Sequence, residues 1–440
     1  MENNFDTIVA IATPMAKSAI GIIRISGSKA FDIAKSIFKG KIENHKICFG
    51  HIVDRDKRLD EVILLPFEAP RSYTGEDVIE IQSHGSFTIL NNILELAISK
   101  GARPAQRGEF TKRAFLNGRL DLSQAEAVLD LINSKSSKSV DSALNNLEGY
   151  LKAKINIIKK NLTDLYSKLI ASVDFPEDVA EVDNNYIVTI CNDNIQEINK
   201  ILSASKSHDF LRDGINACLI GRPNVGKSSL FNALLNYNRS IVTEIEGTTR
   251  DTIKENINIG GFLVNFCDTA GIRDKKNADK VEKIGIDNSI EAIKQSEIIL
   301  FLFEKNISEI DENLLNLAKD KKIILIKTKS DINPKNIENA LNISSVTGNG
   351  IEELKSKILD VIREIIPEDT DYTTNKRHQT CLIKSKEALL NVINTVNSNR
   401  LADLCASDLK EAILSLDEIT GEVLTDNILE NIFDNFCIGK

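Results

Sequence analysis

The sequence predicts a multidomain protein of mixed α/β and α class, with an α+β domain, a helical domain in two segments and an inserted α/β domain. Three observations lead to this fold class. At 440 residues the chain is too long for one hydrophobic core, so two or three domains are expected. Strand and helix patterns alternate from residue 214 to about 365, which indicates a parallel sheet with crossover helices. Helical patterns lie on both sides of that stretch, so the α/β domain is expected to interrupt a helical one.

Composition narrows the class of protein. Hydrophobic residues make up 42% and charged residues 27% of the chain, as in soluble globular proteins. The net charge of -9 argues against a protein that coats nucleic acid, although a local RNA-binding patch stays possible. The seven cysteines form no CxxC pair, which disfavours a zinc knuckle and favours a reducing compartment. Because we find neither a targeting signal nor a membrane-span pattern, we expect a cytoplasmic protein that does not enter the membrane.

Residues 1–118 mix strands and helices. Apolar, β-branched runs at 21–25, 60–67 and 77–82 end in Gly, Pro or polar residues and predict strands. Residues 86–100 have the apolar spacing of an amphipathic helix. We expect these elements to form one α+β domain.

The helical domain is predicted to comprise residues 119–210 and 371–440. Apolar residues three and four apart run through 122–134 and 148–173, and a proline with a run of acids interrupts the pattern at 174–185. In the last helix, one apolar face is expected to be buried up to the residue before Cys437. Its members are Leu424, Ile428, Ile432 and Phe436.

The segment INACLIGRPNVGKSSLFNALL reads as a strand, a loop and a helix. The loop fits the phosphate-binding pattern GxxxxGK[ST] with Gly221, Gly226, Lys227 and Ser228. The glycines let backbone N–H groups close around phosphate oxygens, and Lys227 adds charge at the β and γ phosphates. The Ser228 hydroxyl is a ligand for Mg²⁺. The flanking strand and helix make a chance match improbable.

Two later stretches resemble nucleotide-sensing loops. In EGTTRD, Thr248 and Thr249 lie at the distance of a first switch loop, and Thr249 is the natural second hydroxyl on magnesium. A hairpin turning at 260–261 leads into DTAG, where Asp268 can hold the metal through water. The N–H group of Gly271 can sense the γ phosphate.

The base is predicted to be guanine. Lys329 and Asp331 follow a buried strand, and a carboxylate accepts two hydrogen bonds from guanine that adenine cannot donate. This order of motifs resembles the translation-factor-related GTPases, and Ser344 and Ser345 match their last base-contacting loop. Thr328 departs from the Asn usual there.

The residue after DTAG is Ile272, which cannot orient a water molecule, so another group must do so. Asn224 could offer its carbonyl oxygen to a monovalent cation beside the phosphates, or could be an ordinary turn residue.

Taken together, the motifs resemble the MnmE (TrmE) family of tRNA-modification GTPases, in the TrmE-Era-EngA-like class of potassium-dependent GTPases. The resemblance covers essentially the whole chain. It rests on GRPNVGKSSL, EGTTRD, DTAGIRD and FCIGK, with DTIVAIATP, GIIRISG, SYTGEDVIEIQSHG, GEFTKRAFLNGRLDLSQAEAVLDLI and ITGEVLTDNILENIF. It implies an N-terminal tetrahydrofolate-binding and dimerisation domain (1–118), a helical domain in two parts (119–210 and 371–440) and an inserted Ras-like P-loop GTPase domain (211–370).

The resemblance also implies a reaction. With the flavoprotein MnmG (GidA), which carries FAD, such proteins add an aminomethyl or carboxymethylaminomethyl group to carbon 5 of the wobble uridine, position 34, of certain tRNAs. The carbon comes from 5,10-methylene-tetrahydrofolate, for which 5-formyl-tetrahydrofolate is an analogue, and the nitrogen from ammonium or glycine. The expected assembly is a homodimer that joins MnmG in an α2β2 heterotetramer, with GTP, Mg²⁺ and K⁺ as ligands.

Carried over by position, the potassium ligands are Asn224, Thr243, Ile245 and Thr248, and the cation would take the place of an arginine finger. Glu282 would orient the attacking water, although on sequence alone it is one more helical surface acid. The residues expected to contact GTP are Asn224, Val225, Gly226, Lys227, Ser228, Ser229, Thr243, Glu244, Ile245, Glu246, Gly247, Thr248, Thr249, Asp268, Thr269, Ala270, Gly271, Lys329, Asp331, Ser344 and Ser345.

The matching folate positions are Arg24, Glu80, Arg119 and Lys440. A carboxylate such as Glu80 can bind the ring amide and amino group of a pterin, and the glutamate tail needs cations. Arg119 stands where relatives often have Lys, which keeps the charge and changes the geometry. Read alone, Arg24 and Glu80 are ordinary residues near strand ends.

The last helix is expected to bring CIGK towards the folate domain, with that of a dimer partner as the expected recipient. Cys437 could then attack the uracil ring as a thiolate, could only shape the site, or could be a small buried thiol. Prenylation is disfavoured because the chain ends in Lys and Gly439 breaks the aliphatic pair.

Two other interpretations use the same motifs. A regulatory or ribosome-assembly GTPase explains residues 214–365 equally well, but it leaves the N-terminal segment unexplained and would need a KH-like GXXG module. A free-standing folate aminomethyltransferase would bind folate without depending on tRNA. Candidate tRNA contacts, which could equally be solvated faces, are Arg103, Arg107, Lys112, Arg113 and the lysine-rich helix at 152–160.

Overall fold

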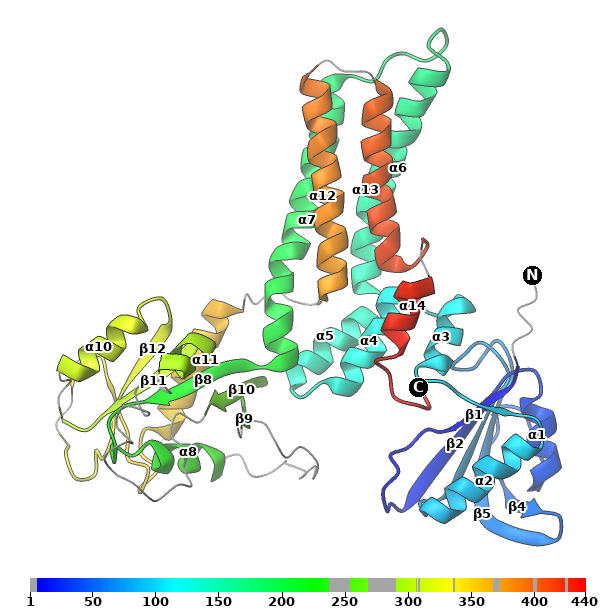
Figure 1. Ribbon diagram of the computed structural model, residues 1–440, viewed down its shortest axis with the longest axis horizontal. Helices are drawn as coiled ribbons and strands as arrows, with labels where there is room; N and C mark the ends of the chain where they lie inside the picture. The colour runs from blue at the N-terminus through cyan, green and yellow to red at the C-terminus, as the bar shows by residue number, and fades with distance from the viewer. Residues whose placement is uncertain are drawn as a thin grey trace. The chain divides into compact units, whose positions relative to one another are not determined.

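The computed structural model describes residues 6–236, 254–267, 290–305, 307, 309–334, 337–366, 372, 374–398, 402–423 and 426–440. The chain divides into two compact units (Figure 1). The first consists of Met1–Leu129, Leu147–Asn184 and Glu387–Lys440, and the second of Asp130–Asn146 and Asn185–Lys386. Helices belong to both units, so this division does not decide the domain boundaries predicted at 118, 210 and 370, which stay predictions.

A seven-stranded sheet forms the N-terminal part of the first unit, in the order β3-β4-β5-β6-β2-β1-β7. Neighbouring strands are antiparallel except β1 and β7. The strands are β1 (Ile8–Ile11), β2 (Ile20–Ser26), β3 (Phe38–Lys39), β4 (Cys48–Asp54), β5 (Lys57–Phe67), β6 (Val78–His84) and β7 (Arg103–Pro104). The strands predicted at 21–25, 60–67 and 77–82 are confirmed.

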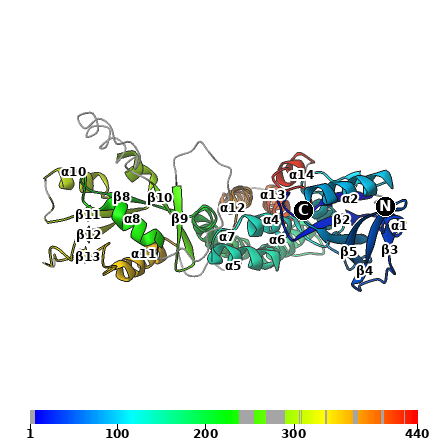
Figure 2. The same ribbon diagram turned by 90° about the horizontal axis from the view of Figure 1, so that it is seen from below.

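Helices α1 (Ala30–Ile37) and α2 (Phe87–Ser99) cover one face of this sheet (Figure 2). Ile23 and Ile81 lie in the core that these helices share with the sheet. Because side chains alternate along a strand, the residues between them, such as Arg24 and Glu80, face the other side of the sheet.

The helices of the first unit begin with α3 (Glu109–Leu116) and include α6 (Tyr150–Asp174), α13 (Ala402–Thr420) and α14 (Asp426–Phe433). Helices α4 (Leu122–Asn133) and α12 (Lys376–Asn397) have several residues in each unit, while α5 (Ser137–Leu147) and α7 (Asn184–Asp213) each have one terminal residue in the first unit. Helix α13 packs along α6, where Lys159 pairs with Asp417 at 2.6 Å.

The apolar face predicted for the last helix differs in part. Helix α14 ends at Phe433, and Phe436 is buried in the turn that follows rather than on the helix. Phe433 and Phe436 pack together, with ring centroids 5.5 Å apart, in a cluster with Leu122. Ile432 is only partly buried, and Leu424 lies outside the described residues.

A six-stranded sheet forms the centre of the second unit, in the order β13-β12-β11-β8-β10-β9, parallel except for β9. The strands are β8 (Ile215–Ile220), β9 (Lys254–Ile259), β10 (Phe262–Cys267), β11 (Ile298–Phe303), β12 (Lys322–Lys327) and β13 (Leu341–Asn342). The helices are α5 (Ser137–Leu147), α7 (Asn184–Asp213), α8 (Lys227–Asn236), α10 (Glu309–Leu317) and α11 (Ile351–Ile365).

This sheet is buried on both faces, as a parallel sheet requires. Leu219 and Leu300 lie in one core cluster, and Ile220 and Phe301 lie in another. Strand β8 leads directly into the phosphate-binding loop and α8, which gives the P-loop GTPase arrangement that the sequence predicts. The hairpin turn predicted at Gly260 and Gly261 is confirmed by positive φ angles of 59° and 90°.

Among the helices that the structure describes, none combines the length and the apolar character needed to cross a membrane.

Candidate functional sites

The phosphate-binding loop has the backbone that its sequence predicts. Asn224 and Gly226 have φ angles of 62° and 102°, in the left-handed region. At Gly221 an added Cβ would lie 2.3 Å from the carbonyl oxygen of Leu302, so only glycine fits. Lys227 opens α8 and its ammonium donates to the backbone oxygen of Gly221 at 2.5 Å. The lysine charge therefore lies over the loop whose N–H groups would surround phosphate oxygens.

Thr328 links the predicted base-binding loop to the phosphate-binding loop. Its buried hydroxyl donates to the backbone oxygen of Val225 at 2.7 Å, and its own N–H donates to Phe303 at 2.9 Å. A shorter hydroxyl side chain thus makes a contact to the phosphate loop from the position where related GTPases usually have Asn. The sequence showed the departure but not this hydrogen bond.

The loops after β12 and β13 lie at the same edge of the sheet as the phosphate loop, because the carboxyl ends of parallel strands meet there. Lys329 has a φ angle of 57° and pairs with Glu304 at 2.7 Å. Asp331 is exposed and available to a base. Ser344 is buried, and its backbone oxygen accepts from the N–H group of Gly348 at 2.9 Å.

Many of the predicted nucleotide and cation ligands lie outside the described residues. They are Thr243, Glu244, Ile245, Glu246, Gly247, Thr248, Thr249, Asp268, Thr269, Ala270, Gly271 and Glu282. Of the predicted cation ligands, Asn224 and Ser228 are described. The cation sites therefore stay predictions.

Replacing Asp331 with asparagine is expected to weaken GTP binding by about 10- to 100-fold, because charged hydrogen bonds to guanine are lost. The amide also accepts fewer hydrogen bonds and donates two, which should relax the choice of base. Competition of GTP, XTP and ATP against a fluorescent guanine nucleotide measures both effects. Asp320→Asn, at an exposed turn of the same unit, is the matched control. Unchanged GTP affinity in Asp331→Asn would remove the residue from the base site.

A second site lies on the open face of the N-terminal sheet. Arg24 on β2 and Glu80 on β6 are directly opposite in register. The Arg24 guanidinium donates to Glu80 through Nε at 2.8 Å and approaches the same oxygen through Nη2 at 2.7 Å. Its Nη1 donates to the backbone oxygen of Gly439 at 3.3 Å. Both side chains are largely buried, so the pair has a fixed geometry.

The CIGK tail contacts the N-terminal domain of its own chain. Gly108 N–H donates to Cys437 at 3.4 Å and Phe110 N–H donates to Lys440 at 3.2 Å. Gly439 has a φ angle of 93°, and a Cβ there would lie 2.6 Å from the backbone oxygen of Ile11. The tail thus passes too close to β1 for any larger residue.

Cys437 is exposed, whereas the other cysteines in the described part of the chain are buried. The buried-thiol interpretation is therefore wrong. Burial lowers the pKa of the Lys440 ammonium, and the nearby Arg24 charge lowers it further.

Arg119 and Arg24 meet at Tyr73, a residue that the sequence did not single out. Each guanidinium carbon lies 5.1 Å from the centroid of the Tyr73 ring. Arg119 also donates from Nη1 to the backbone oxygen of Tyr73 at 2.7 Å. The structure thus brings the predicted folate residues Arg24, Glu80, Arg119 and Lys440 into one region through Arg24. A ring flanked by two arginines could not be read from sequence, since β2, the 73 loop and the 119 turn are far apart in the chain.

Two of the candidate tRNA contacts have protein partners instead. The Arg113 side chain is 2% exposed and donates to Asp6, Glu76 and Glu109. Arg103 pairs with Asp6 at 2.6 Å and holds the pKa of that carboxyl at about 2. Arg113 is thereby excluded as a tRNA contact, and the Arg103 guanidinium is already paired with a carboxylate.

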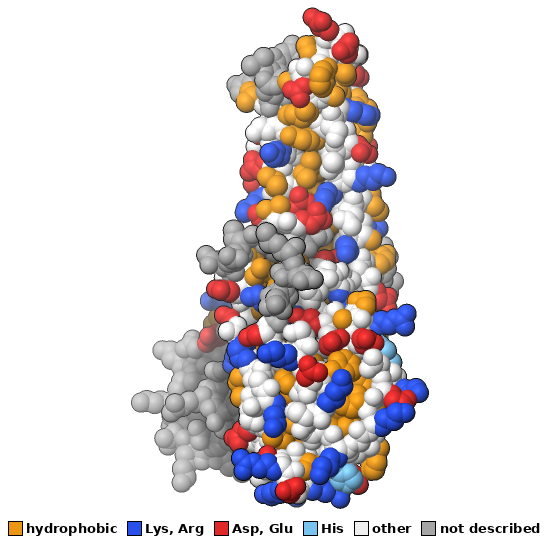
Figure 3. Space-filling model, turned by 90° about the vertical axis from the view of Figure 1, so that its right-hand side faces the viewer, with side chains coloured by type: hydrophobic (Ala, Val, Ile, Leu, Met, Phe, Trp, Pro, Cys, Tyr) orange, Lys and Arg blue, Asp and Glu red, His pale blue; other side chains and the backbone are white. Residues whose placement is uncertain are grey.

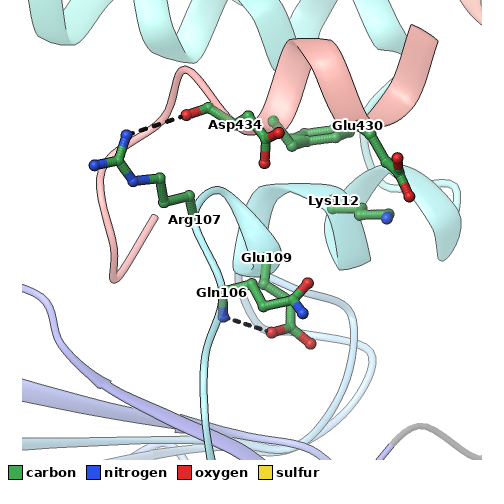
Figure 4. A pocket seen from close by; sticks show the side chains of 7 residues that line it. Gln106, Arg107, Glu109, Lys112, Glu430 and Asp434 are labelled. Carbon is green, nitrogen blue, oxygen red and sulfur yellow. Dashed lines mark hydrogen bonds between the residues drawn. The ribbon is translucent and has the colours of Figure 1, made fainter. Parts of the chain in front are cut away.

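Arg107 and Lys112 line a pocket together with acidic residues (Figure 4). Arg107 donates to the backbone oxygen of Asp434 at 3.4 Å, and Glu109 accepts from the Gln106 N–H group at 2.8 Å. The whole lining is Gln106, Arg107, Glu109, Lys112, Glu430, Phe433 and Asp434. Its mixed charge does not favour a phosphate backbone.

Comparison with known proteins identifies relatives over the full chain. The family model for the GTP-binding protein TrmE N-terminus matches residues 7–119, and that for the MnmE helical domain matches residues 122–437. The tRNA modification GTPase MnmE of Thermoanaerobacter sp. (strain X514) is 39% identical over 461 residues, covering 99% of this chain and all of that protein. The protein of the same name from Streptococcus agalactiae is 40% identical and covers 99% of both chains.

The chain also has similarity to solved structures. The G domain of the T. maritima FeoB iron transporter is 28% identical over 34% of this chain and 98% of its own, with a TM-score of 0.25. Era in complex with MgGDPNP and a segment of 16S ribosomal RNA is 25% identical over 39% of this chain and 66% of its own, with a TM-score of 0.26. At such TM-scores these two matches support no argument.

Proposed function

The chain belongs to the MnmE (TrmE) family, and we propose that it is a GTP-hydrolysing tRNA-modification enzyme. The observation that carries the proposal is the presence, in one chain, of a phosphate-binding loop and a separate site formed by Arg24, Glu80, Arg119 and Lys440. A simple regulatory GTPase would have no use for the second site.

The finer proposal is that the enzyme works in the cytoplasm with the flavoprotein MnmG, which carries FAD, in an α2β2 heterotetramer. It would add an aminomethyl or carboxymethylaminomethyl group to carbon 5 of the wobble uridine, position 34.

In the proposed GTP site, the N–H groups of residues 224–229 and the Lys227 ammonium hold the phosphates, and Asp331 selects guanine. Mg²⁺ would be held by Ser228 and Thr249. K⁺ would be held by Asn224, Thr243, Ile245 and Thr248, and would supply positive charge between the β and γ phosphates. Asn224 supports this proposal because it lies in the phosphate-binding loop and its side-chain amide has a carbonyl oxygen.

The potassium site predicts an ion-dependent rate. Replacing K⁺ with Na⁺ at constant ionic strength should lower GTP turnover by about tenfold or more, since the cation stabilises charge in the transition state. Asn224→Ala should lower turnover in K⁺ at least to the Na⁺ level, because the proposed carbonyl ligand is lost and Ala is strained at a φ angle of 62°. Steady-state phosphate release measures the turnover of the unmodified chain and of the variant in each salt. Equal rates in the two salts would contradict the potassium proposal.

In the proposed folate site, Glu80 would bind the ring amide and amino group of the pterin while Arg24 holds the carboxylate in place. Arg119 and Lys440 would face the anionic tail. The one-carbon unit of 5,10-methylene-tetrahydrofolate would supply the carbon that is transferred. Cys437, exposed on the tail beside this site, is the proposed thiol for attack on the uracil ring.

Glu80→Gln is expected to weaken 5-formyl-tetrahydrofolate binding by about 10- to 100-fold, because a charged hydrogen-bond acceptor is lost and Arg24 keeps an unpaired charge. Calorimetric titration measures the affinity. Glu95→Gln, on the exposed side of α2, is the control and should bind normally. A Glu80→Gln protein that binds as tightly as the unmodified chain would refute the assignment.

We further propose that the N-terminal domain forms a homodimer. The face of its sheet opposite α1 and α2 has exposed apolar residues, with Phe49 and Ile63 paired across β4 and β5 and 66% and 37% exposed. Ile20 on the same face is 57% exposed. In the lower part of Figure 3, hydrophobic side chains of this domain lie among Lys and Arg side chains. Exposed apolar groups of this kind mark contact surfaces.

The whole function is tested by reconstitution. The purified chain, FAD-loaded MnmG of a relative, unmodified tRNA, GTP, Mg²⁺, K⁺, 5,10-methylene-tetrahydrofolate and ammonium or glycine should together yield the modified uridine. Omitting GTP or the folate should prevent its formation. A product that forms without the folate would contradict the proposed carbon source.

A further inference from the structure

We propose that Tyr73 is a positioning residue that holds the guanidinium of Arg119 in place for the anionic tail of the folate, which rests on the folate site proposed above. The Tyr73 ring is itself fixed at two points. Its hydroxyl is hydrogen-bonded at 2.8 Å to Oγ1 of Thr111, a buried residue of α3. The guanidinium carbon of Arg24 lies 5.1 Å from its centroid. The ring is therefore a rigid part of the domain.

Arg119 depends on Tyr73 for its side-chain contacts. The guanidinium carbon lies 5.1 Å from the ring centroid, and Nη1 donates to the Tyr73 backbone oxygen at 2.7 Å. Among the described residues, this is the only hydrogen bond that the Arg119 side chain donates, and no carboxylate forms an ion pair with it. Most of its five N–H donors are thus left for a ligand. A cation held over an aromatic face keeps its charge and loses less freedom when an anion binds.

Arg24 has partners that do not involve Tyr73. It pairs with Glu80 at 2.7 Å, donates to Gly439 at 3.3 Å and lies 5.6 Å from the Phe110 ring. Loss of the Tyr73 ring should leave Arg24 in place, whereas Arg119 would lose its contact with the ring and keep only the hydrogen bond to the backbone oxygen of residue 73. Because Glu80 already compensates the Arg24 charge, Arg119 is the better cation for a carboxylate tail. The effect of Tyr73 should therefore be confined to ligands that have a tail.

Binding of two different ligands distinguishes a positioning role of Tyr73 from a general disturbance of the folate site. On the full-length protein, 5-formyl-tetrahydrofolate has the glutamate tail, and 6-methyltetrahydropterin has none. Tyr73→Leu should weaken binding of the first by about tenfold and of the second by less than about twofold. Tyr73→Phe keeps the ring and should restore most of the affinity. Tyr150→Leu is the matched control, since that ring contacts Lys154 at 5.8 Å elsewhere in the chain, and it should change neither affinity.

A double-variant cycle tests whether Tyr73 acts through Arg119. Arg119→Ala should weaken 5-formyl-tetrahydrofolate binding, and Tyr73→Leu with Arg119→Ala should bind no more weakly than Arg119→Ala alone. Additive losses, or equal losses for both ligands in Tyr73→Leu, would overturn the positioning role. If Tyr73→Leu does not fold, Tyr73→Met supplies the same comparison. A wild-type chain that binds neither ligand would instead overturn the folate site itself, which distinguishes the two failures.

Discussion

Replacing Lys227 with alanine should lower the GTP turnover rate by about a hundredfold or more, because a positive charge that acts on the phosphates in the transition state is removed. The structure places that ammonium over the phosphate loop, 2.5 Å from the backbone oxygen of Gly221. The positive φ angles of the loop belong to Asn224 and Gly226, which the substitution leaves unchanged. The variant should therefore fold and lose chemistry rather than structure.

Phosphate release under saturating GTP measures the loss, and thermal unfolding checks the fold. Lys319→Ala is the matched control, because Lys319 is exposed in the same unit and is not among the predicted nucleotide contacts. Turnover in Lys227→Ala within about twofold of the control would be incompatible with a P-loop GTPase.

Glu282→Ala is expected to keep GTP binding and to lose about 100-fold or more in turnover, because a residue that orients the attacking water contributes on that scale. Its position lies outside the described residues, so the prediction rests on the motif order and on Ile272, which cannot orient water. The test measures nucleotide affinity and GTP turnover on the same variant protein, both in K⁺.

Glu291→Ala, an exposed acid a few residues further along, controls for a general loss of negative charge in this part of the chain. If Glu282→Ala hydrolyses GTP at the control rate in K⁺, another group orients the water and the assignment fails.

Local patterns were sufficient to predict much of the fold. The strands at 21–25, 60–67 and 77–82 and the hairpin at Gly260 and Gly261 have strong signals, because β-branched runs and positive-φ glycines act locally. The phosphate loop was predictable for the same reason. The end of helix α14 was harder to predict. Apolar spacing continues past Phe433 while the chain turns, and spacing alone does not mark where a helix ends.

Contacts between distant segments could not be predicted from local patterns. The Arg24–Glu80 pair requires the register of β2 and β6, and the hydrogen bond from Thr328 to Val225 requires two loops to meet at a sheet edge. The resemblance to a family supplied the folate positions, but not Tyr73, which connects two of them. Arg113 shows the opposite case: its basic run suggested a nucleic-acid contact, and burial among carboxylates excludes it.

The central claim is that GTP hydrolysis by this chain serves the modification of a tRNA wobble uridine. The most direct measurement is mass spectrometry of nucleosides in tRNA from cells that lack the protein, with and without its gene restored. The account predicts that the substituent on carbon 5 disappears without the protein and returns with it, but not with Lys227→Ala. An unchanged nucleoside profile would contradict the account and leave a potassium-type regulatory GTPase as the better interpretation.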